Sequence, residues 1–181
     1  MRLEVLDAEG FAAYADEAIA VYAEAMQRPP QMASQRKAML QQHLRYGGVI
    51  AVLAVEDDGR LIGFGYGYPG RSGQWWHDAV AVALGADGAD WVADSFEVVE
   101  LHVRPAYQAQ GIGRQLLSTM LDQARQPTAL LSTHDRESPA RRLYRSLGFV
   151  DLLCDYRFPG GVEQFCIMGA PLPVEARSQA G

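Results

Sequence analysis

The chain has 181 residues, of which 49% are hydrophobic and 21% are charged, as in ordinary globular proteins. Its 16 Lys and Arg residues against 22 Asp and Glu residues leave a net charge of −6. This charge argues against nucleic acid as the main partner, because duplex binding usually leaves a basic footprint. No stretch approaches the roughly 18 apolar residues of a membrane span, and the charged N-terminus does not resemble a secretory signal. We therefore expect a cytoplasmic protein without a membrane partner, with one domain over residues 1–170 and a tail over residues 171–181.

Before residue 69, strand and helix patterns alternate along the chain. Apolar residues recur at helical spacing between Ala8 and Gln27, and the pair Pro29-Pro30 is expected to end that helix. Two apolar runs flank the turn Asp57-Asp58-Gly59-Arg60, which is typical of a hairpin. The patterns predict helices over residues 8–27 and 34–45 and strands over residues 2–6, 49–56 and 61–68.

Residues 69–95 have the least regular pattern and hold all three tryptophans, so we expect an insertion with one helix there. Strand and helix patterns alternate again after it, and residues 96–133 form a candidate βαβ unit. The whole order predicts an α+β fold, in which helices flank a mixed, mostly antiparallel central sheet. The later part is expected to contain strands over residues 96–103, 128–133, 149–158 and 162–170 and helices over residues 112–125 and 139–147.

The two cysteines, Cys154 and Cys166, fall in the predicted C-terminal hairpin. We expect two buried thiols in a reducing cytosol, with a disulfide as the alternative. Cys and His residues do not cluster at metal-ligand spacing, so no metal is expected.

The turn from Gln108 to Gly113 joins a predicted strand to a predicted helix. Unpaired backbone N–H groups and the helix dipole favour an anion at such a helix start. Glycines remove the side chains that would keep the anion away. The turn is thus a candidate phosphate site, although a Gly-x-Gly turn taken alone more often reflects tight packing.

Two longer motifs contain or follow this turn. The stretch Val99-Glu100-Leu101-His102-Val103-Arg104-Pro105, followed by Gln108-x-x-Gly111-x-Gly113, resembles motif A of the GNAT acetyltransferase superfamily. The stretch Ala140-Arg141-Arg142-Leu143-Tyr144-Arg145-Ser146-Leu147-Gly148-Phe149 resembles motif B of the same family. The resemblance covers about 55 residues and implies the acyl-CoA N-acyltransferase fold, with acetyl-CoA as cosubstrate.

The resemblance also implies which residues bind that cosubstrate. The backbone of the strand segment would pair with the pantetheine arm as an added strand does, and the amides of the turn would bind the pyrophosphate. The strand segment consists of Leu101, His102 and Val103, and the turn residues are Ala109, Gln110, Gly111, Ile112, Gly113 and Arg114.

Direct acetyl transfer requires a base, an oxyanion donor and an acid. A substrate ammonium must lose a proton before its nitrogen attacks the thioester. We expect Glu97 as the base, with Glu100 as its competitor and a water chain as the alternative to either. The oxyanion would accept from the backbone N–H of His102 or Val103. Tyr144 takes the position of the family's tyrosine acid, with a core tyrosine as the alternative.

The sequence accordingly predicts an N-acetyltransferase that moves an acetyl group from acetyl-CoA to a primary amine in a ternary complex. The rival hypothesis is a non-catalytic acyl-CoA-binding or regulatory module on the same fold. The acceptor is a small-molecule or peptide amine, and the resemblance leaves a homodimer open. The aromatic residues of the insertion either line the acceptor pocket or cap the core, and they are Trp75, Trp76, His77 and Trp91.

Overall fold

The computed structural model describes residues 1–174, except the side chains of Pro30 and Gln31, and it contains two compact units. Unit 1 comprises Met1–Tyr68 and Val98–Gln123, and unit 2 comprises Pro69–Glu97 and the described residues from Ala124 onward. The predicted tail beyond residue 174 lies outside the described residues. Whether the chain behaves as the single domain expected over residues 1–170 stays a prediction.

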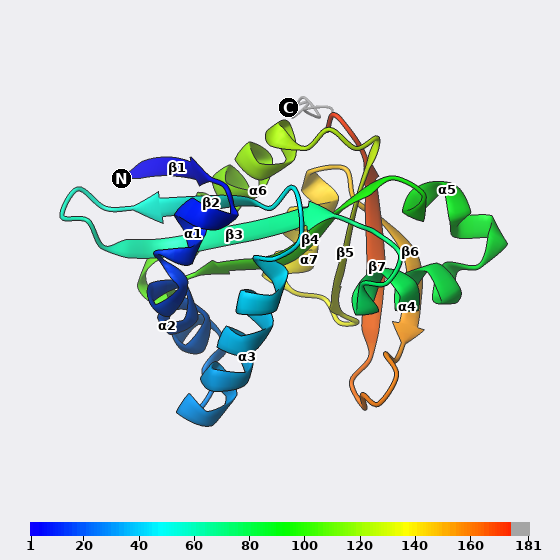
Figure 1. The fold of residues 1–181 in the computed structure, drawn as a ribbon, viewed down its shortest axis with the longest axis horizontal. Helices are drawn as coiled ribbons and strands as arrows, with labels where there is room; N and C mark the ends of the chain where they lie inside the picture. Colours follow the sequence, from blue (N-terminus) through cyan, green and yellow to red (C-terminus); the bar gives the residue numbers. More distant parts are fainter. Residues whose placement is uncertain (175–181) are drawn as a thin grey trace. The chain divides into compact units, whose positions relative to one another are not determined.

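Unit 1 is a sheet with helices on it (Figure 1). Its strands follow the order β1-β2-β3-β4, with antiparallel β1-β2 and β2-β3 pairs. Helices α2 and α3 run beside each other. The strands are β1 Arg2–Leu6, β2 Ile50–Val55, β3 Leu61–Pro69 and the Val98–Val103 part of β4 Ser95–Val103; the helices are α1 Ala8–Ala12, α2 Ala15–Met26, α3 Pro30–His43 and α6 Ile112–Gln123.

Strand β3 alternates glycine with aromatic residues, and this alternation separates its two faces. Phe64, Tyr66 and Tyr68 are buried in one core cluster together with side chains of α1, α2 and α3. On the opposite face, a Cβ at Gly63 would lie 3.2 Å from the side chain of Leu116 in α6. The glycines therefore let α6 pack closely against the sheet.

Unit 2 contains the rest of the sheet, in the order β4-β5-β7-β6. Ser95–Glu97 of β4 pair with β5 in parallel, as the predicted βαβ unit requires, whereas β7 pairs with both β5 and β6 in antiparallel. The mostly antiparallel α+β class is confirmed. The further elements are β5 Thr128–His134, β6 Val150–Tyr156, β7 Phe165–Pro171, α4 Trp75–Leu84, α5 Ala89–Val92 and α7 Pro139–Ser146.

Three helical segments differ from the sequence prediction. The helix expected over residues 8–27 is broken at Ala13 and Tyr14 into α1 and α2. Helix α3 begins four residues early, because Pro30 lacks an N–H and fits the first helical position. The insertion holds two α-helices rather than one, since Gly85, with φ of 60°, ends α4 before a 3₁₀ turn and α5.

The expectation of two free thiols is wrong, because Cys154 and Cys166 form a disulfide. Strands β6 and β7 are antiparallel neighbours, and their register places the two Cα atoms 4.0 Å apart. Register shifts between Asp151 and Leu153 and between Leu153 and Tyr156 contribute to this placement. The bond covalently joins the last two strands of unit 2.

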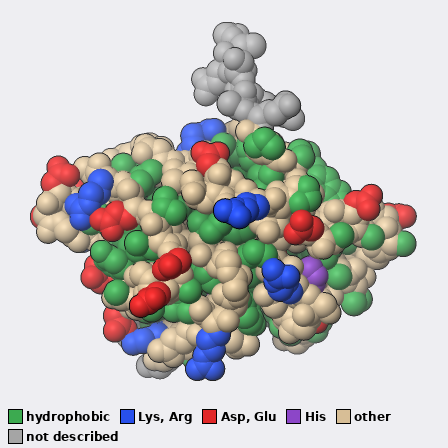
Figure 2. All heavy atoms as spheres, turned by 45° about the horizontal axis from the view of Figure 1, so that its top comes forward, with side chains coloured by type: hydrophobic (Ala, Val, Ile, Leu, Met, Phe, Trp, Pro, Cys, Tyr) green, Lys and Arg blue, Asp and Glu red, His purple; other side chains and the backbone are tan. Residues whose placement is uncertain are grey.

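The described surface carries charges of both signs. On the face drawn in Figure 2, Lys and Arg side chains lie interspersed with Asp and Glu side chains, and hydrophobic side chains lie between them. Within residues 1–174, the structure has no helix that is long and apolar enough to cross a membrane.

Candidate active site

Glu97 is a buried carboxylate of unit 2. Its side chain is 2% exposed, and its Oε1 lies 2.8 Å from Nδ1 of His77 in α4. Gly70 leaves room for this pair, because a Cβ there would lie 2.6 Å from the same His77 nitrogen. Burial raises the pKa of Glu97, and the hydrogen bond to Glu97 raises the pKa of His77. The structure therefore places Glu97 in a closed acid–histidine pair.

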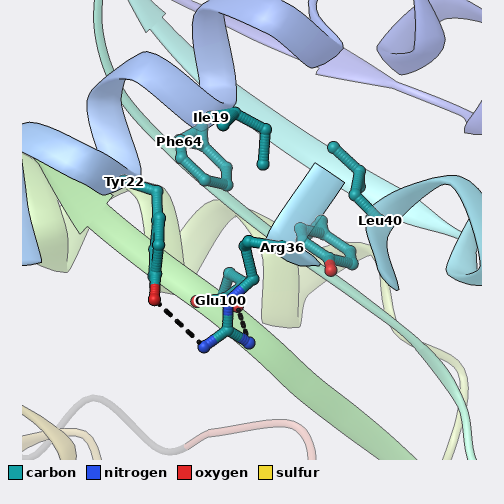
Figure 3. Close-up of a pocket in the computed structure, with 7 residues that line it drawn as sticks. Ile19, Tyr22, Arg36, Leu40, Phe64 and Glu100 are labelled. Carbon is teal, nitrogen blue, oxygen red and sulfur yellow. Dashed lines mark hydrogen bonds and ion pairs between the residues drawn. The ribbon is translucent and has the colours of Figure 1, made fainter. Parts of the chain in front are cut away.

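Glu100 lies in unit 1, where it lines a small pocket (Figure 3). Its Oε2 is 2.5 Å from Nε2 of His102, and its Oε1 is 2.8 Å from Nη1 of Arg36 in α3. The residue is only 8% exposed, and Oε1 has no aligned hydrogen bond to any described residue. The pocket is lined by Ile19, Tyr22, Arg36, Leu40, Phe64, Tyr66 and Glu100.

Arg36 is the cation of this pocket. Its guanidinium carbon lies 4.7 Å from the centre of the Tyr22 ring, and Nη2 donates to the Tyr22 hydroxyl at 3.3 Å. Burial alone would lower the pKa of Arg36, but the Glu100 carboxylate and the Tyr22 hydroxyl raise it above its ordinary value. The side chain thus stays charged and compensates the buried carboxylate.

The turn after β4 is held by its own polar contacts. The Arg104 Nε donates to the Leu61 carbonyl at 2.8 Å, and the Gln108 side chain donates to the Val103 carbonyl at 2.9 Å. Ala109 and Gly111 adopt φ of 60° and 80°, the left-handed region. A backbone of this kind turns successive N–H groups toward a common centre, which is an anion-binding geometry.

Helix α6 continues directly from this turn. Its first backbone hydrogen bond back to the turn runs from Gln115 N to Gly111 O at 3.1 Å. The N–H groups before Gln115 precede the helical ladder, as at any helix start. A Cβ at Gly111 would meet no atom within 4 Å. The turn is therefore sterically open beside a row of backbone donors.

The other backbone segment of the prediction, Leu101–Val103, is half-buried in unit 1. In the described residues, the parallel ladder with β5 covers Ser95–Glu97 of β4 only. On the β3 side, a Cβ at Gly63 would lie 3.1 Å from the His102 carbonyl oxygen. The segment is held closely against β3 and lies beyond the β5 ladder.

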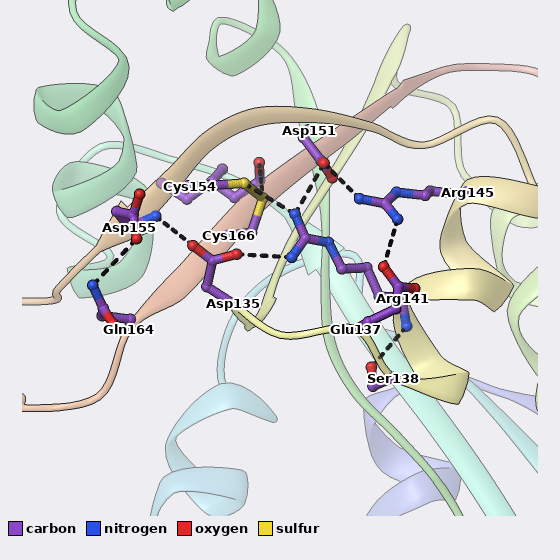
Figure 4. A network of polar contacts seen from close by, with 11 residues as sticks. Asp135, Glu137, Ser138, Arg141, Arg145, Asp151, Cys154, Asp155, Gln164 and Cys166 are labelled. Atoms are coloured by element: carbon purple, nitrogen blue, oxygen red, sulfur yellow. Dashed lines mark hydrogen bonds and ion pairs between the residues drawn. A yellow bond between two sulfur atoms is a disulfide. The ribbon is translucent and has the colours of Figure 1, made fainter.

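Tyr144 lies in α7 of unit 2, half-buried, with its ring centre 5.9 Å from that of Phe149. Helix α7 begins at a capped end, where Ser138 Oγ accepts from Arg141 N at 3.1 Å. Arg141 in turn pairs with Asp135 at 2.7 Å and with Asp151 at 2.9 Å (Figure 4). These ion pairs fix the helix that carries Tyr144.

Two tryptophans of the insertion and the residues around the end of β5 lie in structural surroundings. Trp76 donates to Ser132 Oγ at 3.1 Å, and Trp76 and Trp91 both pack on a core cluster of unit 2, which favours the core-capping alternative for these two. His134 stacks on Phe165. Ligand atoms of Asp135, Cys154 and Cys166 lie within 4.8 Å of one another, but both sulfurs are used in the disulfide.

Of the predicted site residues, the structure brings Glu100 into contact with His102. Glu97 belongs to a separate pair with His77. Sequence reasoning missed Arg36 and the aromatic wall of the pocket. The usable signal was the helical spacing of Arg36 and Leu40, which puts both on one face of α3.

Comparison with known proteins identifies acetyltransferases as relatives of this chain. A model of the acetyltransferase (GNAT) family matches residues 15–149. A GCN5-like protein acetyltransferase of Mycobacterium tuberculosis is 33% identical, over 87% of this chain and 91% of that protein. The N-alpha-acetyltransferase RimI of the same organism is 46% identical over 30% of this chain and 34% of its own length. The solved ribosomal-protein-S18-alanine N-acetyltransferase of Escherichia coli superposes with a TM-score of 0.65 at 18% identity, over 99% of this chain and 97% of that one.

The His77–Glu97 pair predicts a pH-dependent stability of unit 2. Both pKa values are raised in the folded state, so the folded state holds more protons and loses stability as pH rises through the raised His77 pKa. We expect the free energy of unfolding to fall as pH rises above about 6.5. In His77→Gln this fall should flatten. Urea unfolding followed by tryptophan fluorescence checks it, since all three tryptophans lie in unit 2, and equal slopes in both proteins would contradict it.

Proposed function

Because the chain belongs to the GNAT family of acetyltransferases, we propose that it transfers acetyl from acetyl-CoA directly to a primary amine received at Glu100. N-acetylation with acetyl-CoA as cosubstrate follows from the family itself. The observation that carries the acceptor assignment is the 8% exposed Glu100 carboxylate, which lines a pocket and already holds a cation. A buried carboxylate with an exchangeable cation is suited to receive a substrate ammonium.

The donor side of the proposal rests on the turn before α6. The positive φ at Ala109 and Gly111, and the open space at Gly111, fit a pyrophosphate bound by backbone N–H groups. The donors would be the amides of Ala109, Gln110, Gly111, Ile112, Gly113 and Arg114. The backbone of Leu101, His102 and Val103, beyond the β5 ladder, would pair with the pantetheine arm.

Each proton in the proposed reaction has an assigned carrier. The Glu100 carboxylate takes a proton from the substrate ammonium, and the neutral nitrogen then forms the C–N bond at the thioester carbon. The oxyanion accepts from the backbone N–H of His102 or Val103. The C–S bond breaks, and the thiolate takes the Tyr144 hydroxyl proton. The acylated nitrogen releases its second proton as the amide forms, and this proton restores the Tyr144 hydroxyl through solvent. Glu97 is the less suitable base, because its partner His77 is itself only 11% exposed, whereas the Arg36 side chain that faces Glu100 is 33% exposed.

The names of the relatives support one class of acceptor. The mycobacterial relative that aligns with 87% of the chain is named a protein acetyltransferase, and RimI is named an N-alpha-acetyltransferase. These names support an amine on a protein or peptide as acceptor, with a small-molecule amine as the second choice. The cytoplasmic location, the homodimer and the absence of a metal stay predictions.

Gly111→Ala should weaken acetyl-CoA binding. An alanine at φ of 80° strains the turn, at a cost of about 1 kcal/mol or more, so we expect the Kd to rise roughly tenfold. Gly160→Ala is the matched control, since Gly160 has φ of 79° and equally open space but lies in unit 2, outside the turn. Isothermal titration with acetyl-CoA measures both variants. Equal affinities for the two variants, or no micromolar binding by the wild type, would remove the turn from the donor site.

Glu100→Gln should abolish most turnover, because an amide neither accepts the proton nor compensates an ammonium. We expect kcat/KM for the amine to fall by about 10²-fold or more, the usual size of general-base effects. Glu97→Gln is the matched variant on the same strand, and its loss should stay below about tenfold. Release of free thiol in an amine panel gives both values. A larger loss in Glu97→Gln would assign the base to Glu97.

Tyr144→Phe should lower kcat by roughly 10²-fold and leave the Kd of acetyl-CoA nearly unchanged. The phenyl ring keeps the contact with Phe149, whereas the proton for the leaving thiolate is lost. Single-turnover rates with saturating acetyl-CoA measure the chemical step. An unchanged rate would leave Tyr144 as a packing residue.

A further inference from the structure

We propose that Arg36 is an internal cation that the acceptor amine must displace from Glu100, so that this one side chain gates the acceptor pocket and selects its ligand. The inference deepens the proposed function and rests on it, because both use the same pocket. It adds a residue of α3, which belongs to neither family motif, to the determinants of acceptor choice.

The contacts of Arg36 are those that a bound ammonium would make. Its Nη1 lies 2.8 Å from Glu100 Oε1, and its guanidinium lies 4.7 Å from the centre of the Tyr22 ring (Figure 3). A carboxylate and an aromatic face are the two groups that attract an organic cation in a protein. In the structure these groups are occupied by part of the chain itself.

The contact between Arg36 and Glu100 can be exchanged for a contact with another cation. Glu100 Oε2 is held by His102, but Oε1 has no aligned hydrogen bond to any described residue and only an ion pair with Arg36. The Arg36 side chain is 33% exposed, whereas that of Glu100 is 9% exposed. The cation can therefore move into water while the anion stays in place and needs a replacement.

The volume of the pocket makes displacement necessary. The cavity beside these residues accommodates about one water molecule. An amine with even a short alkyl stem is larger than this. The acceptor can reach Glu100 only when the Arg36 guanidinium leaves.

The walls of the pocket define the class of ligand. Ile19, Leu40 and Phe64 supply apolar surface around the single charged end at Glu100. A long, slim aliphatic stem that ends in a cation, as in Arg36 itself, matches these walls. We therefore expect an unbranched alkylammonium, such as a lysine side chain, rather than an amine on a branched carbon.

The test compares Arg36→Ala with the wild type and with Arg45→Ala. Arg45 is exposed just after α3, so its variant has the same change in net charge without touching the pocket. Ethylguanidinium is the binding probe, and Nα-acetyl-lysine amide is the acceptor. We expect ethylguanidinium to bind Arg36→Ala at millimolar concentration by NMR titration, and not to bind the other two proteins. The KM for the lysine amide should fall at least fivefold in Arg36→Ala only.

Two further variants keep the test decisive. Arg36→Lys retains a cation and should behave as the wild type does. Arg36→Met retains an unbranched side chain without the charge, and it replaces Arg36→Ala if the latter does not fold. A folded, uncharged variant that does not bind ethylguanidinium, or whose KM is unchanged, overturns the gate. Ethylguanidinium binding without acetyl transfer by any of the proteins keeps the gate and instead refutes the proposed function.

Discussion

A carboxylate that is buried among aromatic side chains must have a compensating cation, and in unit 1 this requirement organises the pocket. Glu100 is 8% exposed beside Tyr22 and Tyr66, so ionising it without a partner would be costly. His102 holds one carboxylate oxygen and Arg36 faces the other. The position of α3, which carries Arg36, is thereby linked to the charge on β4. In unit 2 the charges are reversed, because the buried group is the Arg141 cation and the compensating carboxylates are those of Asp135 and Asp151.

In the proposed reaction, the acyl donor and the acceptor amine would be bound by different parts of the protein, backbone in one case and side chains in the other. The donor would be bound by backbone N–H groups of the turn around Gly111, and such groups depend on chain conformation rather than on side-chain identity. The acceptor would be chosen by side chains from four elements, α2, α3, β3 and β4. Family membership therefore specifies acetyl-CoA, whereas the acceptor has to be argued from the pocket of this chain alone.

The sequence predicts best what is local. The strand, turn and helix over residues 95–123 follow from contiguous signals, and the structure has them within a few residues of the predicted bounds. The disulfide could not be predicted, because it depends on two register shifts in β6. The Arg36–Glu100 pair joins residues that are 64 positions apart, and a charged residue on a helix usually faces water. The sequence predicts one helix in the Trp-rich insertion, whereas the structure has two, because the glycine at the end of α4 divides the segment.

The glycine face of β3 has a consequence for how variants of this protein would behave. A Cβ at Gly63 would lie 3.2 Å from the Leu116 side chain of α6. A Cβ at Gly65 would lie 3.6 Å from the Met120 side chain of the same helix. The same helix begins directly after the turn around Gly111. A larger side chain at either glycine would displace α6, and with it the amides that we propose to bind the pyrophosphate. Under the proposed function, affinity for the acyl donor would thus depend on a strand that need not touch the donor, and a mutational screen confined to the turn would miss these positions.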